Sequence, residues 1–360
     1  MKILTVFGTR PEIIRLSVVI KELDSCVDQI LVHTGQNYDP LLSDVFLTEM
    51  GIRSVNYNLG VQAATVGQQV GQILERIDKV IEIEKPDRLL ILGDTNSGLA
   101  AIIAARRRIP VYHMEAGNRC YDNRVPEETN RRIIDHCSDI LLPYTNRSAE
   151  NLVREGISRE RIFVTGNPIY EVIKAYQDQI GNSLVLDRLG IQKGSYFLAT
   201  IHRAENVDSS SRLTEIISGI QAVAEHFNMK VILSVHPRTE NQMLKHGVSV
   251  DSKKISLQKP FGFFDFVALE MNAKGILTDS GTVQEEACIF GIPNITIRDV
   301  TERPETSEAG SNYLSGASPE LILIGMKMAV ADCSLWVPPV EYTKLNVSKT
   351  VAKILLSYRF

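Results

Sequence analysis

The chain has 360 residues, of which 44% are hydrophobic and 23% are charged, and its formal net charge is -4. This length suits two ordinary domains with a core in each, and the composition excludes a disordered chain. A slightly acidic chain lacks the basic field that drives nucleic-acid binding, so we expect a small-molecule partner and no nucleic acid.

Cysteine usage and the apolar runs bound the cellular setting. The five cysteines are widely scattered without a CxxC pair, which predicts reduced thiols and neither disulfides nor a metal site. The first residues lack the apolar core of a signal peptide, and no apolar run approaches the ~18 residues of a membrane span. We therefore expect a cytoplasmic protein with no membrane partner.

Short β-rich apolar runs alternate with amphipathic stretches along the chain. The first series predicts strands at 2–7, 29–32, 88–92, 110–114, 140–142 and 161–164, and the second at 196–201, 230–235, 254–257, 274–278 and 293–297. Such alternation is typical of βα units around a parallel sheet. The predicted fold class is α/β with two Rossmann-like, doubly wound domains.

The predicted domain boundaries follow from a polar stretch between the two series. We place the hinge within 170–193, which gives an N-terminal domain at 1–172 and a C-terminal domain at 173–345. Residues 347–358 predict a final helix, within a segment 346–360 that could pack back on the N-terminal domain.

Polar segments follow the predicted strands of both halves. They include Gly8 to Pro11, Gly93 to Asn96, Glu115 to Gly117, His202 to Glu205, His236 to Arg238 and Asp279 to Thr282. In open parallel sheets, ligands bind in the crevice outside the carboxyl ends of the strands. The sequence therefore predicts one shared cleft between the two domains.

Neither GxGxxG nor GxxxxGK[ST] occurs, which argues against NAD and ATP, and we expect no cofactor. The segment Gly8 to Pro11 offers either a phosphate site at a helix N-terminus or an ordinary βα turn. Ser280, Gly281 and Thr282 offer N–H groups and a hydroxyl to an anion.

Charged residues around this second segment have two readings. Glu285 and Glu286 are expected in the first turn of the following helix, where one complements the helix dipole or accepts hydrogen bonds from a ribose diol. Arg298 and Arg303 belong to a charged loop that is either solvated or placed at the cleft mouth.

Three carboxylates, those of Asp94, Glu115 and Glu127, lie in the loops after strands of the first half and are candidate acid and base groups. The alternative for any one of them is a helix cap or an arginine partner. His202 and His236 could donate to phosphate or shuttle a proton, or could simply be hydrogen-bonded at a strand end.

Eight motifs occur in order along the chain. They are FGTRPE (7–12), GDTNS (93–97), HMEAG (113–117), PEETNR (126–131), TGNP (165–168), HRAEN (202–206), LTDSGTVQEE (277–286) and RDVTERPE (298–305). With them, the sequence resembles the non-hydrolysing UDP-N-acetylglucosamine 2-epimerase family over essentially its whole length. That resemblance implies a GT-B-like fold, a UDP-sugar substrate and a homodimer.

The resemblance also implies roles for individual residues. Catalysis is expected from Asp94, Glu115, Glu127 and His202. UDP or substrate contacts are expected from Arg10, Gln36, Arg131, His236, Phe266, Ser280, Gly281, Thr282, Glu286 and Arg303, with Phe266 near the uracil.

Two departures from the family pattern concern the substrate and regulation. Residues 117–126 differ from the usual Gly-Leu-Arg-Thr segment of the GlcNAc enzymes, and the chain looks like the branch that forms UDP-N-acetyl-L-fucosamine from UDP-2-acetamido-2,6-dideoxy-L-talose for capsule or O-antigen. UDP-N-acetylglucosamine and UDP-2,3-diacetamido-glucuronate are the alternative substrates. Asn37 follows Gln36 where the family has His, in a region linked to activation by UDP-N-acetylglucosamine, which predicts turnover without that activator.

Other classes of function remain open at this point. A GT-B glycosyltransferase or a hydrolysing epimerase would use the same fold and donor, whereas a nucleotide-sugar sensor would bind without turnover. Incubation with a UDP-sugar alone separates them: a transferase needs an acceptor, a hydrolase accumulates UDP and an epimerase yields an isomeric UDP-sugar.

Overall fold

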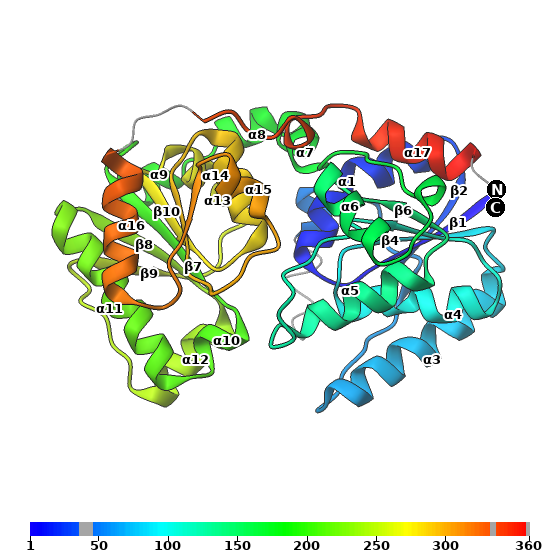
Figure 1. The fold of residues 1–360 in the computed structure, drawn as a ribbon, viewed down its shortest axis with the longest axis horizontal. Coiled ribbons are helices and arrows are strands. Elements are labelled where there is room, and N and C mark those ends of the chain that lie inside the picture. Colours follow the sequence, from blue (N-terminus) through cyan, green and yellow to red (C-terminus); the bar gives the residue numbers. More distant parts are fainter. Residues whose placement is uncertain (36–45, 332–335, 358–360) are drawn as a thin grey trace. The chain divides into compact units, whose positions relative to one another are not determined.

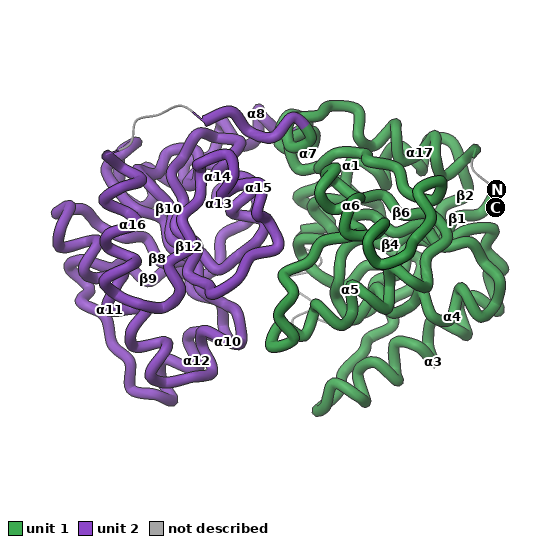
Figure 2. The backbone as a smooth tube through the Cα atoms, in the orientation of Figure 1, with its two compact units in different colours: residues 1–175, 341–360 green, residues 176–340 purple. Residues whose placement is uncertain are grey.

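The computed structural model describes residues 1–35, 46–331 and 336–357, and the chain forms two compact units (Figure 2). Unit 1 comprises Met1–Ala175 and Glu341–Phe360, and unit 2 comprises Tyr176–Val340. The boundaries expected from the sequence, 172/173 and 345/346, differ from these by a few residues. The terminal helix α17 (Val347–Ser357) belongs to unit 1 and packs on α1 (Arg10–Asp24).

Unit 1 is built on a six-stranded parallel sheet. Its strands are β1 (Lys2–Phe7), β2 (Asp28–His33), β3 (Tyr57–Asn58), β4 (Arg88–Leu92), β5 (Val111–Met114) and β6 (Ile140–Leu142). They lie in the order β3-β2-β1-β4-β5-β6. All residues of the central strand β4 are buried, as expected for a parallel sheet covered on both faces.

Helices cover this sheet (Figure 1). Besides α1 and α17, the helices described in this unit include α3 (Val66–Glu84), α4 (Ala100–Arg106), α5 (Pro126–Cys137), α6 (Asn146–Arg154) and α7 (Ile169–Ala175), with short 3-10 turns η1 (Asn96–Leu99), η2 (Arg159–Arg161) and η3 (Val340–Tyr342). Ile73 and Ile77 of α3 join Leu4 and Val6 of β1 in one apolar cluster. Because side chains of a strand alternate between faces, this cluster defines one face of the sheet, and Figure 1 shows α1 and α17 on the other.

Unit 2 repeats the same plan. Its parallel strands are β7 (Tyr196–Ile201), β8 (Lys230–Val235), β9 (Ile255–Gln258), β10 (Gly275–Thr278), β11 (Asn294–Thr296) and β12 (Asn312–Leu314). They lie in the order β12-β11-β10-β7-β8-β9, which is the order of unit 1 read from the opposite edge.

The helices of unit 2 are α8 (Gln177–Gly181), α9 (Val185–Leu189), α10 (Ala204–Val207), α11 (Ser210–Phe227), α12 (Pro237–His246), α13 (Phe263–Asn272), α14 (Gly281–Phe290), α15 (Pro304–Glu308) and α16 (Pro319–Ala331). Leu213 and Ile220 of α11 and Ile322 of α16 share an apolar cluster with Phe197 of β7. The amphipathic helix α11 is thereby fixed against the sheet.

The predicted α/β class with two Rossmann-like sheets is confirmed, but single elements differ. The strand expected at 161–164 is wrong, because Arg159–Arg161 forms a 3-10 turn and Ile162 makes only an isolated bridge to Leu141. The short edge strands β3 and β12 were not anticipated. Among the described residues no helix is long and apolar enough to cross a membrane.

Candidate functional site

In each sheet the winding of the chain reverses between two central strands. These are β1 and β4 in unit 1 and β7 and β10 in unit 2. Connections on either side of such a point run to opposite faces, so the strand ends there stay uncovered and hold ligands in doubly wound folds. The predicted segments after β1, β4, β7 and β10 therefore lie at the two switch points.

The loops after β1 and β4 are joined by Glu12, which the sequence analysis did not select. Its Oε2 accepts hydrogen bonds from the backbone N–H groups of Gly8 at 2.6 Å and Thr9 at 2.8 Å, and Thr95 Oγ1 lies 2.6 Å from Oε1. Thr9 and Glu12 have the spacing of a capping box, the signal that could have found it. Burial raises the pKa of Glu12 to about 7, against the hydrogen bonds from Thr95, Gly8 and Thr9.

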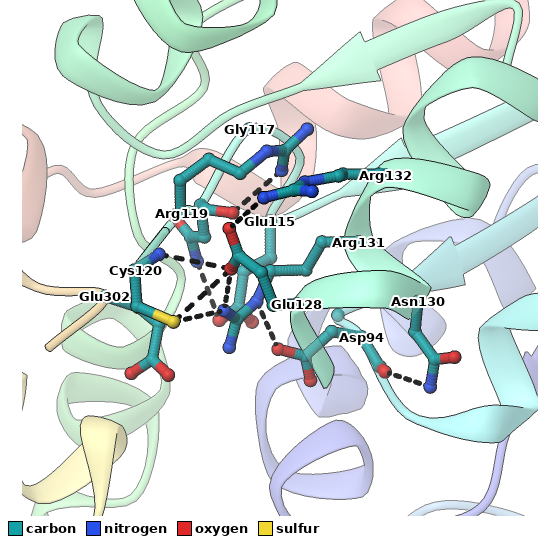
Figure 3. A network of polar contacts seen from close by, with 12 residues as sticks. Asp94, Glu115, Gly117, Arg119, Cys120, Glu128, Asn130, Arg131, Arg132 and Glu302 are labelled. Carbon is teal, nitrogen blue, oxygen red and sulfur yellow. Dashed lines mark hydrogen bonds and ion pairs between the residues drawn. The ribbon is translucent and has the colours of Figure 1, made fainter. Parts of the chain in front are cut away.

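Asp94 is fixed by an arginine on α5. Arg131 Nε lies 2.8 Å from Asp94 Oδ2, and Arg131 Nη1 lies 2.7 Å from Glu128 Oε2 (Figure 3). Asn130 Nδ2 donates to the carbonyl oxygen of Asp94. Asp94 and Arg131, both predicted site residues, are thus in direct contact.

Glu128, one position after the predicted Glu127, is a fully buried carboxylate of α5. Burial would raise its pKa, but the backbone N–H groups of Cys120 and Tyr121 and the guanidinium of Arg131 outweigh that effect and hold the pKa below its usual range. Glu127 itself was expected in a strand-end loop, but it lies in the first turn of α5 and is half-buried.

Glu115 directly follows β5 and has a positive φ of 66°, a conformation that costs a non-glycine residue on the order of 1–3 kcal/mol and is frequent at functional sites. Arg15 Nη1 of α1 lies 2.7 Å from Glu115 Oε2, and the guanidinium is buried. Asn118 Nδ2 donates to the other carboxylate oxygen at 3.1 Å. Arg15 was missed because its partner lies far away in the sequence.

A buried network of polar contacts surrounds the carboxyl end of β5. Asp135 of α5 contacts His113 Nδ1 and Arg119 Nη2, each at 2.8 Å, while His113 Nε2 lies 2.8 Å from the carbonyl oxygen of Gly93. Burial would raise the pKa of Asp135, but His113 and Arg119 lower it overall. This network ties α5 to the strand ends that carry Asp94 and Glu115.

The remaining predicted residue of unit 1 that the structure describes is Arg10, which is exposed at the start of α1. Its guanidinium carbon lies 5.2 Å from the centre of the Phe46 ring. Gln36 and Asn37 lie outside the described residues.

In unit 2, Asp279 joins the two loops of the switch point. Its buried carboxylate accepts hydrogen bonds from the backbone N–H groups of His202 and Arg203 and from Asn206 Nδ2. His202 Nδ1 lies 3.1 Å from Asp279 Oδ1. Burial alone would raise the pKa of Asp279, but His202 and the other donors hold it at about 2.

The N-terminus of α14 has the form expected for an anion site, although one detail of the prediction is wrong. Ser280 is the N-cap residue, Gly281 and Thr282 begin the helix, and Glu285 and Glu286 are buried in its second turn rather than its first. Arg303 Nε is ion-paired with Glu285. Arg303 also lies beside Gly281: a Cβ added at Gly281 would be 3.8 Å from the guanidinium carbon of Arg303.

His236 and Phe266 complete the predicted set in unit 2. His236 is the N-cap of α12, and its ring centre lies 6.4 Å from that of His202. Phe266 lies half-buried on α13. The structure therefore brings His202 and His236 together, and Ser280, Gly281 and Arg303 together.

Replacement of Glu12 by Gln tests the raised pKa. Between about pH 4.5 and 7 the folded wild type holds a proton that the unfolded chain has lost, so its stability falls across this range, by on the order of 3 kcal/mol, and levels off above it. Gln keeps an oxygen for Gly8 and Thr9 and an N–H for Thr95 without titrating. The unfolding free energy of Glu12→Gln relative to wild type should rise from pH 5 to pH 8 in urea titrations. A difference that does not change with pH would contradict the assignment.

Comparisons with known proteins identify the family to which the chain belongs. A family model described as UDP-N-acetylglucosamine 2-epimerase matches residues 21–356. The UDP-N-acetylglucosamine 2-epimerase of Methanocaldococcus jannaschii is 40% identical over 353 residues, covering 94% of this chain and 95% of that protein. The UDP-2,3-diacetamido-2,3-dideoxy-D-glucuronate 2-epimerase of Pseudomonas aeruginosa is 37% identical over 328 residues, covering 90% of each chain.

A crystal structure of the Methanocaldococcus jannaschii enzyme in complex with UDP-GlcNAc and UDP superposes with a TM-score of 0.94 at 39% identity, covering 99% of this chain and 100% of that one. The family resemblance read from the eight motifs is thereby confirmed. The chain belongs to the non-hydrolysing UDP-N-acetylglucosamine 2-epimerase family, whose members are isomerases of UDP-sugars.

Proposed function

We propose that this epimerase inverts C2 of a UDP-2-acetamido sugar by eliminating UDP to a 2-acetamidoglycal and adding UDP back. No carbonyl lies next to C2 in such a sugar, so direct removal and return of the C2 proton has no stabilised anion. Departure of UDP from C1 as the proton leaves C2 avoids that anion. Return of UDP to C1 with protonation of the opposite face at C2 completes the inversion.

One observation carries this proposal: two carboxylates are fixed at the ends of neighbouring strands. Asp94 follows β4 and is held by Arg131, while Glu115 follows β5 and is held by Arg15. Proton removal from one face and delivery to the other need two groups at defined positions. We assign these roles to Asp94 and Glu115, with Glu127 as a third candidate.

The leaving diphosphate requires a separate set of groups. Helix N-termini and cations stabilise the charge that develops on a departing phosphate. We assign this function to the start of α14, to His236 and to arginines, and the uracil and ribose contacts to Phe266 and Glu286. The full proposed binding set is Arg10, Gln36, Arg131, His236, Phe266, Ser280, Gly281, Thr282, Glu286 and Arg303. We assign His202 to catalysis, together with Asp94, Glu115 and Glu127.

For the substrate we propose UDP-2-acetamido-2,6-dideoxy-L-talose, converted to UDP-N-acetyl-L-fucosamine for capsule or O-antigen. Support comes from residues 117–126, where the sequence departs from the GlcNAc enzymes. In this segment the backbone N–H groups of Cys120 and Tyr121 donate to Glu128, whose partner Arg131 holds Asp94. Changes in the segment therefore reach a proposed catalytic group. We further propose a cytoplasmic homodimer.

A substrate panel tests the choice of sugar. Purified enzyme is incubated with the L-talo compound, UDP-N-acetylglucosamine or UDP-2,3-diacetamido-glucuronate, each alone, and the products are identified by NMR. We expect the highest kcat/KM for the L-talo compound, without added activator and without an acceptor. A higher value for either of the other two would assign the enzyme to that branch instead.

Replacement of Glu115 by Gln tests the acid–base role. The amide approximates the shape but cannot take up a proton, so kcat should fall by about 100-fold or more, whereas the Kd for UDP should change by less than about threefold. Glu127→Gln is measured alongside, and Glu150→Gln, at an exposed position of α6, is the matched control. Parallel losses of kcat and UDP affinity would indicate a binding or structural role.

A further inference from the structure

The hydrogen-bond partners of His202 and His236 in unit 2 show which ring nitrogen of each histidine carries the hydrogen. A neutral imidazole carries its hydrogen on one ring nitrogen and accepts with the other, and the partner of one nitrogen decides the role of both. His202 and His236 have partners of opposite kind at Nδ1. Nδ1 of His202 faces the carboxylate of Asp279, whereas Nδ1 of His236 faces the backbone N–H of Arg238.

The carboxylate of Asp279 determines the tautomer of neutral His202. The carboxylate has only acceptor oxygens, since a pKa of about 2 keeps it ionised at neutral pH. Oδ2 accepts from the backbone N–H groups of His202 and Arg203 at 3.0 and 2.9 Å and from Asn206 Nδ2 at 3.1 Å, while Oδ1 lies 3.1 Å from His202 Nδ1. The hydrogen of neutral His202 therefore lies on Nδ1, and Nε2 carries the lone pair.

The carboxylate is itself held firmly. Asp279 follows β10, which pairs in parallel with β7. The register Thr278 to Thr200 places Asp279 one position before the level of His202 on the neighbouring strand. Asn206 Nδ2 also lies 2.8 Å from the carbonyl oxygen of Ile297, which fixes the amide beside Asp279. The His202 side chain is 40% exposed, so its ring is accessible to a ligand.

His236 has the opposite arrangement. The backbone N–H of Arg238 donates to His236 Nδ1 at 3.2 Å, as expected for an N-cap side chain. Nδ1 is then an acceptor, and the hydrogen of neutral His236 lies on Nε2. Two rings with centres 6.4 Å apart thus offer one acceptor and one donor.

We propose that Asp279 is a positioning residue that fixes His202 with Nε2 as a hydrogen-bond acceptor for an O–H or N–H group of the substrate, while His236 offers Nε2–H to a phosphate oxygen. The proposal rests on the roles given to the two histidines under the proposed function. It assigns them different ligand chemistry: a phosphate oxygen has no hydrogen for His202 to accept, whereas a sugar hydroxyl or an amide does.

Asp279→Asn tests the proposal. The amide oxygen can replace Oδ2 and keep the backbone donors, whereas the amide nitrogen then faces His202 Nδ1, donates to it and moves the ring hydrogen to Nε2. In ¹⁵N NMR of histidine-labelled protein at a pH where the rings are neutral, we expect His202 with Nδ1–H in the wild type and Nε2–H in the variant. A His202→Gln sample assigns the resonance. His236 should show Nε2–H in both proteins.

Turnover gives the second readout. A wrong tautomer at a positioned histidine should lower kcat by at least about tenfold, while the Kd for UDP changes less than about threefold. Asp251→Asn, an exposed position before β9, is the matched control and should leave tautomers and kcat unchanged.

Three results would overturn the proposal: Nε2–H at His202 in the wild type, an unchanged tautomer in Asp279→Asn, or equal losses of kcat and UDP affinity. If the variant does not fold, the wild-type tautomers still decide the assignment. An absence of epimerisation by the wild type would contradict the proposed function alone, since the NMR result does not depend on it.

Discussion

A buried carboxylate bridges the two central strand-end loops of each sheet, and within each unit the geometry of the proposed site residues depends on this bridge. Glu12 joins the loop after β1 to Thr95 after β4, and Asp279 joins the loop after β10 to the backbone after β7. Both lie where the winding of the sheet reverses and no helix connection crosses the strand ends. A site at such a point needs an internal tie, because its loops come from strands that are adjacent in space but distant in sequence.

Burial raises the pKa of both carboxyl groups, but their hydrogen-bond partners make the net shifts opposite. Glu12 accepts hydrogen bonds from neutral groups, and desolvation dominates, so its pKa rises to about 7. Asp279 accepts from three N–H groups and also faces His202, which together outweigh desolvation and hold its pKa at about 2. The same architectural position therefore holds one carboxyl that titrates near neutrality and one that stays ionised. Of the two, Asp279 is the carboxylate that is ionised at neutral pH and faces an imidazole, so it can fix the hydrogen of that ring.

Hydrophobic patterns in the sequence predicted the central strands of both sheets, but missed the edge strands β3 and β12, which have few residues. The apolar runs predicted β1, β4, β6, β7 and β8 with the bounds seen in the structure, since most residues of each strand are buried. The edge strands β3 and β12 have only two and three residues and are partly exposed, so they carry little pattern. The apolar run at 161–164 resembles a strand but lies beyond the sheet edge at β6.

The sequence motifs predicted which loops carry the proposed site residues, but not which side chains contact those residues. Asp94 and Glu115 were recognisable because they follow strands within motifs. Arg15 was not, because it contacts Glu115 across 100 residues of sequence. Glu128 stands three residues before its partner Arg131 on α5, but its burial and its contacts with the backbone of Cys120 and Tyr121 appear only in the structure. Asp279 was placed at a strand end, yet its bond to His202 depends on the pairing of β7 with β10.

The central claim, that C2 is inverted through elimination and re-addition, is tested most directly by isotope exchange at C2. The reaction is run in D2O with a UDP-2-acetamido sugar that the enzyme epimerises, and the product is analysed by NMR and mass spectrometry. The account predicts one deuterium at C2 and none at C3 or C4, with traces of UDP and glycal after long incubation. Epimerised product that retains its original hydrogen at C2 would contradict it.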